Sequence, residues 1–145
     1  INHSNEDLSF MTTYKDITDI QRVAAKYYND KSFCTVVALA IAAGIGFGKA
    51  FHTYRKLGRR RGTGTYRPMQ EQALAKFGLK LEPVPNNFGC KTTKAVGKIA
   101  HKLQGIFWVH CTGHVGCIRD GHYYDQAAKR NKRNIIISRV VPINN

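Results

Sequence analysis

The dipeptide Asp120–Gly121 is the feature that most restricts how this chain can fold. It separates two β-prone runs, residues 114–119 and 122–126. Asp-Gly at such a point is the strong signal for a hairpin with a two-residue turn. With these two residues as the loop, Ile118 pairs with Tyr123 and the register of the whole hairpin is fixed.

That register places two reactive side chains together. Gly116 pairs with Asp125, and His114 lies two residues before Gly116. Because side chains alternate across a strand, His114 and Asp125 share one face as diagonal neighbours within side-chain reach. A carboxylate beside an imidazole fixes its tautomer and stabilises its charged form. The alternative is that Asp125 merely ends a strand and that His114 is an exposed histidine.

The rest of the chain predicts helices first and strands last. Apolar spacing and helix-ending glycines indicate helices at 17–28, 33–43, 47–57, 67–77 and 92–103. Strands are expected at 79–84, 106–111, 114–119, 122–126 and 135–143. The pattern predicts an α+β fold, with helices in the N-terminal two thirds packed on a C-terminal antiparallel sheet. Residues 1–16 are expected to be a flexible leader and 17–145 a single domain.

One charge-free segment, residues 32–48, could be taken for a membrane span. Its 17 residues reach only the lower length limit for a span, and alanines and glycines dilute its hydrophobicity. A helix buried on most faces explains the same composition, so we expect no membrane span.

The charge balance predicts an anionic partner. The chain carries 23 Lys and Arg against 9 Asp and Glu, a formal net charge of +14. Such a field attracts nucleic acid or an acidic protein surface, although a solvated basic surface would have the same composition. The expected anion-binding residues, in two exposed clusters, are Arg59, Arg60, Arg61, Lys129, Arg130, Lys132 and Arg133.

The four cysteines match no zinc-binding spacing, so we expect no metal and no cofactor. They are Cys34, Cys90, Cys111 and Cys117. The first residues are polar and unlike a secretory signal. Reduced thiols and a cytoplasmic location are therefore expected.

Cys34 is the candidate nucleophile. It lies where the polar turn 29–32 gives way to the apolar helix, so unpaired backbone N–H groups should surround it. A helix start and a nearby imidazolium both stabilise a thiolate, and the same N–H groups can donate to an oxyanion. The alternative is a small apolar side chain in a buried helix.

The order of these elements resembles the papain-like cysteine peptidases, particularly their compact bacterial and phage members. The resemblance rests on residues 29–44, 58–63 and 109–126, and extends as element order over about 17–143. It implies a papain-like fold, a Cys34–His114–Asp125 triad and an amide donor to the oxyanion, for which Asn29 is the nearest candidate. It also implies a protein or peptide substrate.

Three functions follow from these expectations, and the third is a nucleic-acid binder whose papain-like appearance is accidental. The first is a cysteine peptidase, or a related thiol-dependent amide hydrolase, that is phage-encoded and acts in the host cytoplasm or the virion. The second is an inactive papain-like binding or virion protein whose basic surface holds nucleic acid or an acidic protein. The sequence sets neither the substrate nor the oligomeric state.

Overall fold

The computed structural model describes residues 26, 28, 32–125 and 131–143. The expected leader 1–16 and most of the expected helix 17–28 lie outside these residues. Within them, each expected helix and strand is present. The helices are α3 (Cys34–Ala43), α4 (Phe47–Lys56), α5 (Arg67–Ala75) and α6 (Thr93–Ile99), and a short 3-10 turn, η4 (Ala100–Lys102), extends α6. The strands are β1 (Leu79–Pro83), β2 (Ile106–Cys111), β3 (His114–Arg119), β4 (His122–Tyr124) and β5 (Ile136–Pro142).

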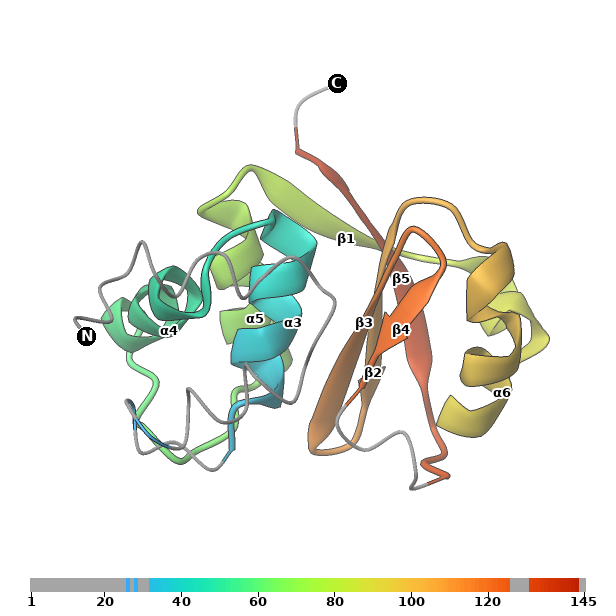
Figure 1. Ribbon diagram of the computed structural model, residues 1–145, viewed down its shortest axis with the longest axis horizontal. Helices are drawn as coiled ribbons and strands as arrows, with labels where there is room; N and C mark the ends of the chain where they lie inside the picture. Colours follow the sequence, from blue (N-terminus) through green and yellow to red (C-terminus); the bar gives the residue numbers. More distant parts are fainter. Residues whose placement is uncertain (1–25, 27, 29–31, 126–130, 144–145) are drawn as a thin grey trace.

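The five strands form one antiparallel sheet in the order β1-β5-β2-β3-β4. Helices α3, α4 and α5 lie on one side of it and α6 on the other (Figure 1). Each side has its own apolar core: Trp108, Val115 and Cys117 pack with α3, whereas Phe107 and Ile118 pack with α6. The predicted α+β architecture, with helices mostly before the sheet, is confirmed.

Helix α3 is apolar all round because it is enclosed. Its residues 35–42 are buried, and it packs against the sheet, α4 and α5. Gly44 ends it in the left-handed conformation, and Arg119 Nη1 donates to the carbonyl of Ile41 at 2.8 Å. In the described part of the chain no single helix is long and apolar enough to cross a membrane. Only α3 and α4 together meet that test, and they are bent by 115°.

The hairpin register follows the prediction. Ile118 pairs with Tyr123 and Arg119 with His122. Asp120 and Gly121 have φ values of 49° and 86°, the left-handed geometry that a two-residue turn requires. The strand positions that carry His114 and Tyr123 therefore face the same way.

A second buried contact ties α5 to the sheet and to the loop 58–65. The Trp108 indole N–H donates to Gln70 Oε1 at 3.0 Å, and Gln70 Nε2 donates to the Thr65 carbonyl at 3.1 Å. Trp108 is fully buried and Gln70 nearly so. Gln70 therefore satisfies a buried donor and holds the end of the loop at the same time.

Replacing Gln70 by leucine is expected to lower the free energy of unfolding by about 1–3 kcal/mol, because the buried indole N–H loses its acceptor. Urea denaturation measures this change. The matched control is Gln72→Leu, at an exposed position of the same helix, for which we expect a change within about 0.5 kcal/mol. Equal losses in the two variants would contradict the structural role of Gln70.

Candidate active site

Three side chains of the β3–β4 hairpin form a hydrogen-bonded chain. His114 Nε2 bonds to Asp125 Oδ1, and the Tyr123 hydroxyl donates to Asp125 Oδ2. The Asp125 side chain has no exposed surface, and His114 is 8% exposed. Burial and the charge of Asp125 raise the pKa of Tyr123, which therefore remains a donor. The predicted pairing of His114 with Asp125 is thus present.

Tyr123 and Gly116 complete this arrangement, and the sequence analysis assigned them no role. A Cβ atom at Gly116 would lie 2.7 Å from Asp125 Oδ2 and 2.9 Å from Tyr123 Cε1. No side chain fits there without displacing one of these groups. The signal was available, because the predicted register places Gly116, Tyr123 and Asp125 on one face.

Cys34 is the first residue of α3, as expected, and α3 packs on the sheet that carries His114. The first helical hydrogen bond runs from Val37 N–H to the Phe33 carbonyl, so the N–H of Cys34 lies outside the helical ladder. Among the described residues nothing accepts a hydrogen bond from this N–H group, so it can donate to a substrate oxygen.

The thiol of Cys34 is activated by its neighbours. Burial by itself raises the pKa of this thiol, but hydrogen bonds from His114 and from the backbone N–H of Val115, with the charge of His114, lower it below its ordinary value. Because Asp125 occupies Nε2, Nδ1 is the ring nitrogen that remains for the thiol.

The same contacts act on His114 in the opposite direction. Burial lowers the pKa of the imidazole, but hydrogen bonds to Asp125 and Cys34, with the charges of both, raise it to about 9. A lowered thiol pKa and a raised imidazole pKa favour a thiolate–imidazolium pair over a broad range of pH.

The other three cysteines are buried and unactivated. Burial raises the pKa of Cys90, Cys111 and Cys117. Cys34 alone among the four is partly exposed and has a lowered pKa.

The arginines of the loop 58–65 do not form one exposed cluster, and the expectation that Arg59 is exposed is wrong. Arg59 is only 6% exposed, because Nε donates to the Thr63 carbonyl at 2.9 Å and Nη2 to the Ser32 carbonyl at 2.6 Å. It therefore anchors the loop to the segment just before Cys34. Arg60 and Arg61 are exposed, and Arg61 Nη1 donates to the Tyr28 carbonyl at 3.2 Å.

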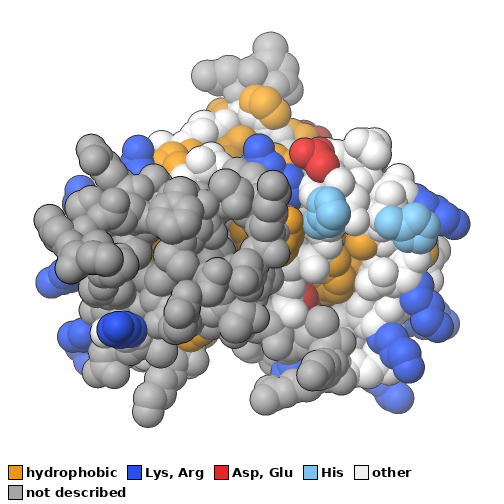
Figure 2. All heavy atoms as spheres, viewed as in Figure 1, with side chains coloured by type: hydrophobic (Ala, Val, Ile, Leu, Met, Phe, Trp, Pro, Cys, Tyr) orange, Lys and Arg blue, Asp and Glu red, His pale blue; other side chains and the backbone are white. Residues whose placement is uncertain are grey.

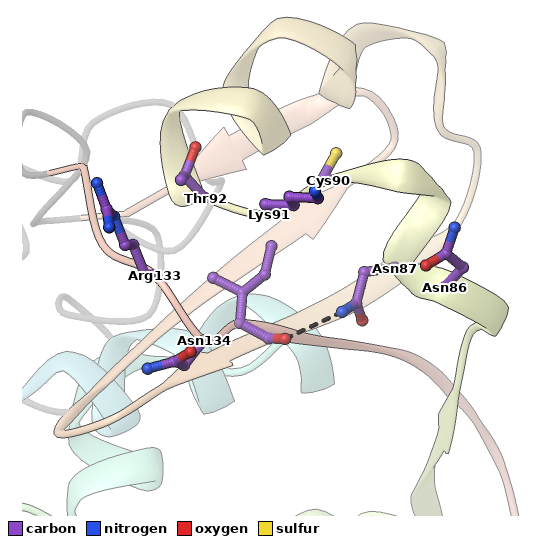
Figure 3. A pocket seen from close by; sticks show the side chains of 8 residues that line it. Asn86, Asn87, Cys90, Lys91, Thr92, Arg133 and Asn134 are labelled. Atoms are coloured by element: carbon purple, nitrogen blue, oxygen red, sulfur yellow. Dashed lines mark hydrogen bonds between the residues drawn. The ribbon is translucent and has the colours of Figure 1, made fainter.

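The second expected basic cluster is described only in part. Lys129 and Arg130, like the oxyanion candidate Asn29, lie outside the described residues. Lys132 is half-buried, and its backbone bonds to Thr93 at the start of α6. Arg133 is exposed and lines a pocket of about 530 Å³ with Lys91 and Asn134 (Figure 3). This pocket is formed away from the Cys34–His114 pair, beside the first turn of α6.

A row of lysines on and around α6 was missed in the sequence. Figure 2 shows Lys and Arg side chains on the side of the molecule that α6 covers. Lys94 and Lys98 lie four residues apart on one face of α6, and this spacing was the available signal. The exposed members are Lys91, Lys94, Lys98 and Lys102. Among the described residues, no group of three or more His, Cys, Asp or Glu side chains could hold a metal ion.

Comparison of the chain with protein-family models, with curated proteins and with solved structures gives no match. The functional argument therefore rests on the geometry of the site.

Proposed function

We propose that this protein is a cysteine peptidase, or a related thiol-dependent amide hydrolase, of papain-like fold. Cys34 is the nucleophile, His114 carries the proton and Asp125 orients His114. One observation carries the proposal: the only activated thiol of the four lies at a helix start, beside an imidazole that a buried carboxylate holds.

The reaction follows from these groups. The Cys34 thiolate attacks the amide carbonyl carbon, and the C=O π electrons move to the oxygen, which the backbone N–H of Cys34 stabilises. The C–N bond then breaks as the His114 imidazolium gives its proton to the leaving amine. His114, now neutral, removes a proton from water, which attacks the thioester and releases the acid and the Cys34 thiolate. Asn29 would be a second oxyanion donor.

The arrangement of elements supports the papain-like assignment. The nucleophile begins the helix that packs on the sheet, while the histidine and the carboxylate lie on a later hairpin of that sheet. The resemblance also favours a phage-encoded protein that acts in the host cytoplasm or is carried in the virion.

Selective labelling tests this function. A peptidyl acyloxymethyl ketone at pH 6 is expected to modify Cys34 and to leave Cys90, Cys111 and Cys117 unmodified, because only Cys34 combines access with a lowered pKa. Peptide mapping by mass spectrometry locates the adduct. Cys34→Ala is the control and should give no adduct in the folded protein. Labelling of Cys34 no faster than that of free cysteine at the same pH would reject the function.

The lysine row of α6 favours the second candidate, an inactive papain-like protein that binds nucleic acid or an acidic protein. Lys91, Lys94, Lys98 and Lys102, on and around α6, are exposed, and α6 lies on the side of the sheet opposite α3 (Figure 1). The labelling experiment separates the two candidates, because a binding protein has no need of an activated thiol.

A further inference from the structure

A pocket of about 900 Å³ lies between the loop 58–65, the start of α5 and the β2–β3 turn. Cys34 and His114 do not themselves line it, but each of two walls is connected to one of them. Gly113, in the turn, directly precedes His114, and Arg59, in the loop wall, is bonded to the carbonyl of Ser32, two residues before Cys34. A substrate held at Cys34 therefore has this pocket beside it.

The pocket is positively charged. Among the residues that the structure describes, Arg59, Arg60, Arg67 and His110 line it and no acidic residue does. Burial and the charge of Arg67 lower the pKa of His110, so this ring is neutral at pH 7. It can donate one hydrogen bond to a ligand and accept another without adding charge to the pocket. Tyr66, which is 85% exposed, also lines the pocket and offers an aromatic face to a ligand.

Arg67 has donor capacity left over. Its Nη2 donates to Ser138 Oγ at 3.2 Å, and its Nε lies 3.6 Å from Glu71 Oε2, on an exposed side chain. Its Nη1 and the Thr65 hydroxyl are buried without a hydrogen-bond partner among the described residues. Unpaired buried donors are rare and costly, and a guanidinium in that state favours an added anionic acceptor.

We propose that this pocket binds a carboxylate of the peptide substrate, either an acidic side chain next to the attacked amide or the C-terminal carboxylate of the peptide. The inference rests on the proposed function and names its substrate class. A nucleic acid fits the pocket less well, because the exposed lysines that would follow a phosphate backbone lie on α6, across the sheet.

Matched electrophilic peptides test the inference. Three acyloxymethyl ketones that differ only in carrying Glu, Gln or Lys next to the electrophile are compared by their rates of Cys34 labelling. Each rate is divided by the rate of the same protein with chloroacetamide, which carries no peptide. We expect the Glu probe to exceed the Gln probe about tenfold, and the Lys probe to be the slowest. The C-terminal carboxylate is tested with a second pair of probes. The rate of Cys34 labelling by a peptide chloroacetamide with a free C-terminal carboxylate is compared with the rate for the same peptide ending in a carboxamide.

Variants connect the preference to the pocket. Arg67→Gln is expected to bring the Glu:Gln ratio to within about threefold of one, and Arg60→Gln to reduce it partly. Arg60 is exposed, so its variant tests the pocket even where Arg67→Gln impairs folding. Lys98→Gln removes the same charge from α6 and should leave the ratio unchanged.

The outcomes separate the inference from the function. A Cys34 that reacts rapidly in a His114-dependent manner, but with no carboxylate preference or with one that survives both arginine variants, overturns the inference and leaves the function standing. A Cys34 that reacts like an ordinary thiol overturns the function itself. A DNA oligonucleotide that blocks all probes equally, with the block relieved in Arg67→Gln, overturns the inference in favour of a nucleic-acid occupant.

Discussion

Replacing His114 by alanine is expected to slow alkylation of Cys34 by chloroacetamide at pH 6 by about threefold or more. The variant removes the imidazole that lowers the pKa of the thiol and leaves the burial that raises it. Each unit of rise in thiol pKa costs about tenfold in thiolate, of which the greater nucleophilicity of a more basic thiolate recovers about threefold. Peptide hydrolysis should fall by about 1,000-fold or more, because the proton carrier is also lost.

The pH dependence distinguishes this mechanism from a simple loss of structure. The imidazole pKa of about 9 means that His114 in the wild-type protein keeps its positive charge up to about pH 9 and loses it above, so the thiolate–imidazolium pair exists between the lowered pKa of the thiol and about pH 9. The alkylation advantage of the wild type over His114→Ala should therefore be largest near pH 6 and shrink above pH 9, where peptide hydrolysis should also decline. The control is His122→Ala, an exposed histidine of the same sheet, whose profile should match the wild type. Parallel profiles for all three proteins would rule out His114 as the partner of Cys34.

The hairpin was predictable because local rules decide it. Asp120–Gly121 permits the left-handed turn, and the alternation of the flanking residues then has only one register that fits. The helix that begins at Cys34 was equally accessible, since a polar turn followed by an unbroken apolar run has few other interpretations. Both predictions depend on neighbours in sequence, and the site follows from combining them.

Arg59 is a residue whose environment could not be predicted from its neighbours in sequence. Three consecutive arginines between glycines indicate an exposed loop. The guanidinium of Arg59, however, donates hydrogen bonds to the backbone carbonyls of Thr63 and Ser32. The need for a donor at those carbonyls arises only once the loop 58–65 lies against the start of α3. Similarly, nothing local assigns Arg67 to a pocket with His110, because only the tertiary fold brings the start of α5 close to the end of β2.

Gly116→Ala is expected to damage both folding and reactivity, because its methyl group would lie 2.7 Å from Asp125 Oδ2 and 3.0 Å from Asp125 Cβ. Gly116 is buried within β3, so neither the strand nor the carboxylate can easily move away. Overpacking of this kind costs about 1–3 kcal/mol in the free energy of unfolding. If Asp125 shifts, His114 loses the bond that orients its ring, and alkylation of Cys34 at pH 6 should slow several-fold in the protein that remains folded. Urea denaturation and chloroacetamide kinetics measure the two effects.

Two further variants show whether the damage passes through Asp125. Gly97→Ala adds a methyl group 3.9 Å from Tyr123 Cδ2, an ordinary contact in the interior of α6, and should raise the unfolding free energy by up to about 1 kcal/mol without slowing alkylation. Tyr123→Phe removes the hydroxyl that donates to Asp125 Oδ2 without adding volume. If Gly116 acts by making room for this carboxylate, Tyr123→Phe should slow alkylation in the same direction but by less, since His114 keeps its own bond to Oδ1. The contrary outcome is a Gly116→Ala protein that is destabilised yet alkylated at the wild-type rate. It would show that Gly116 is needed only for the stability of the sheet, and that the position of Asp125 does not control the reactivity of Cys34.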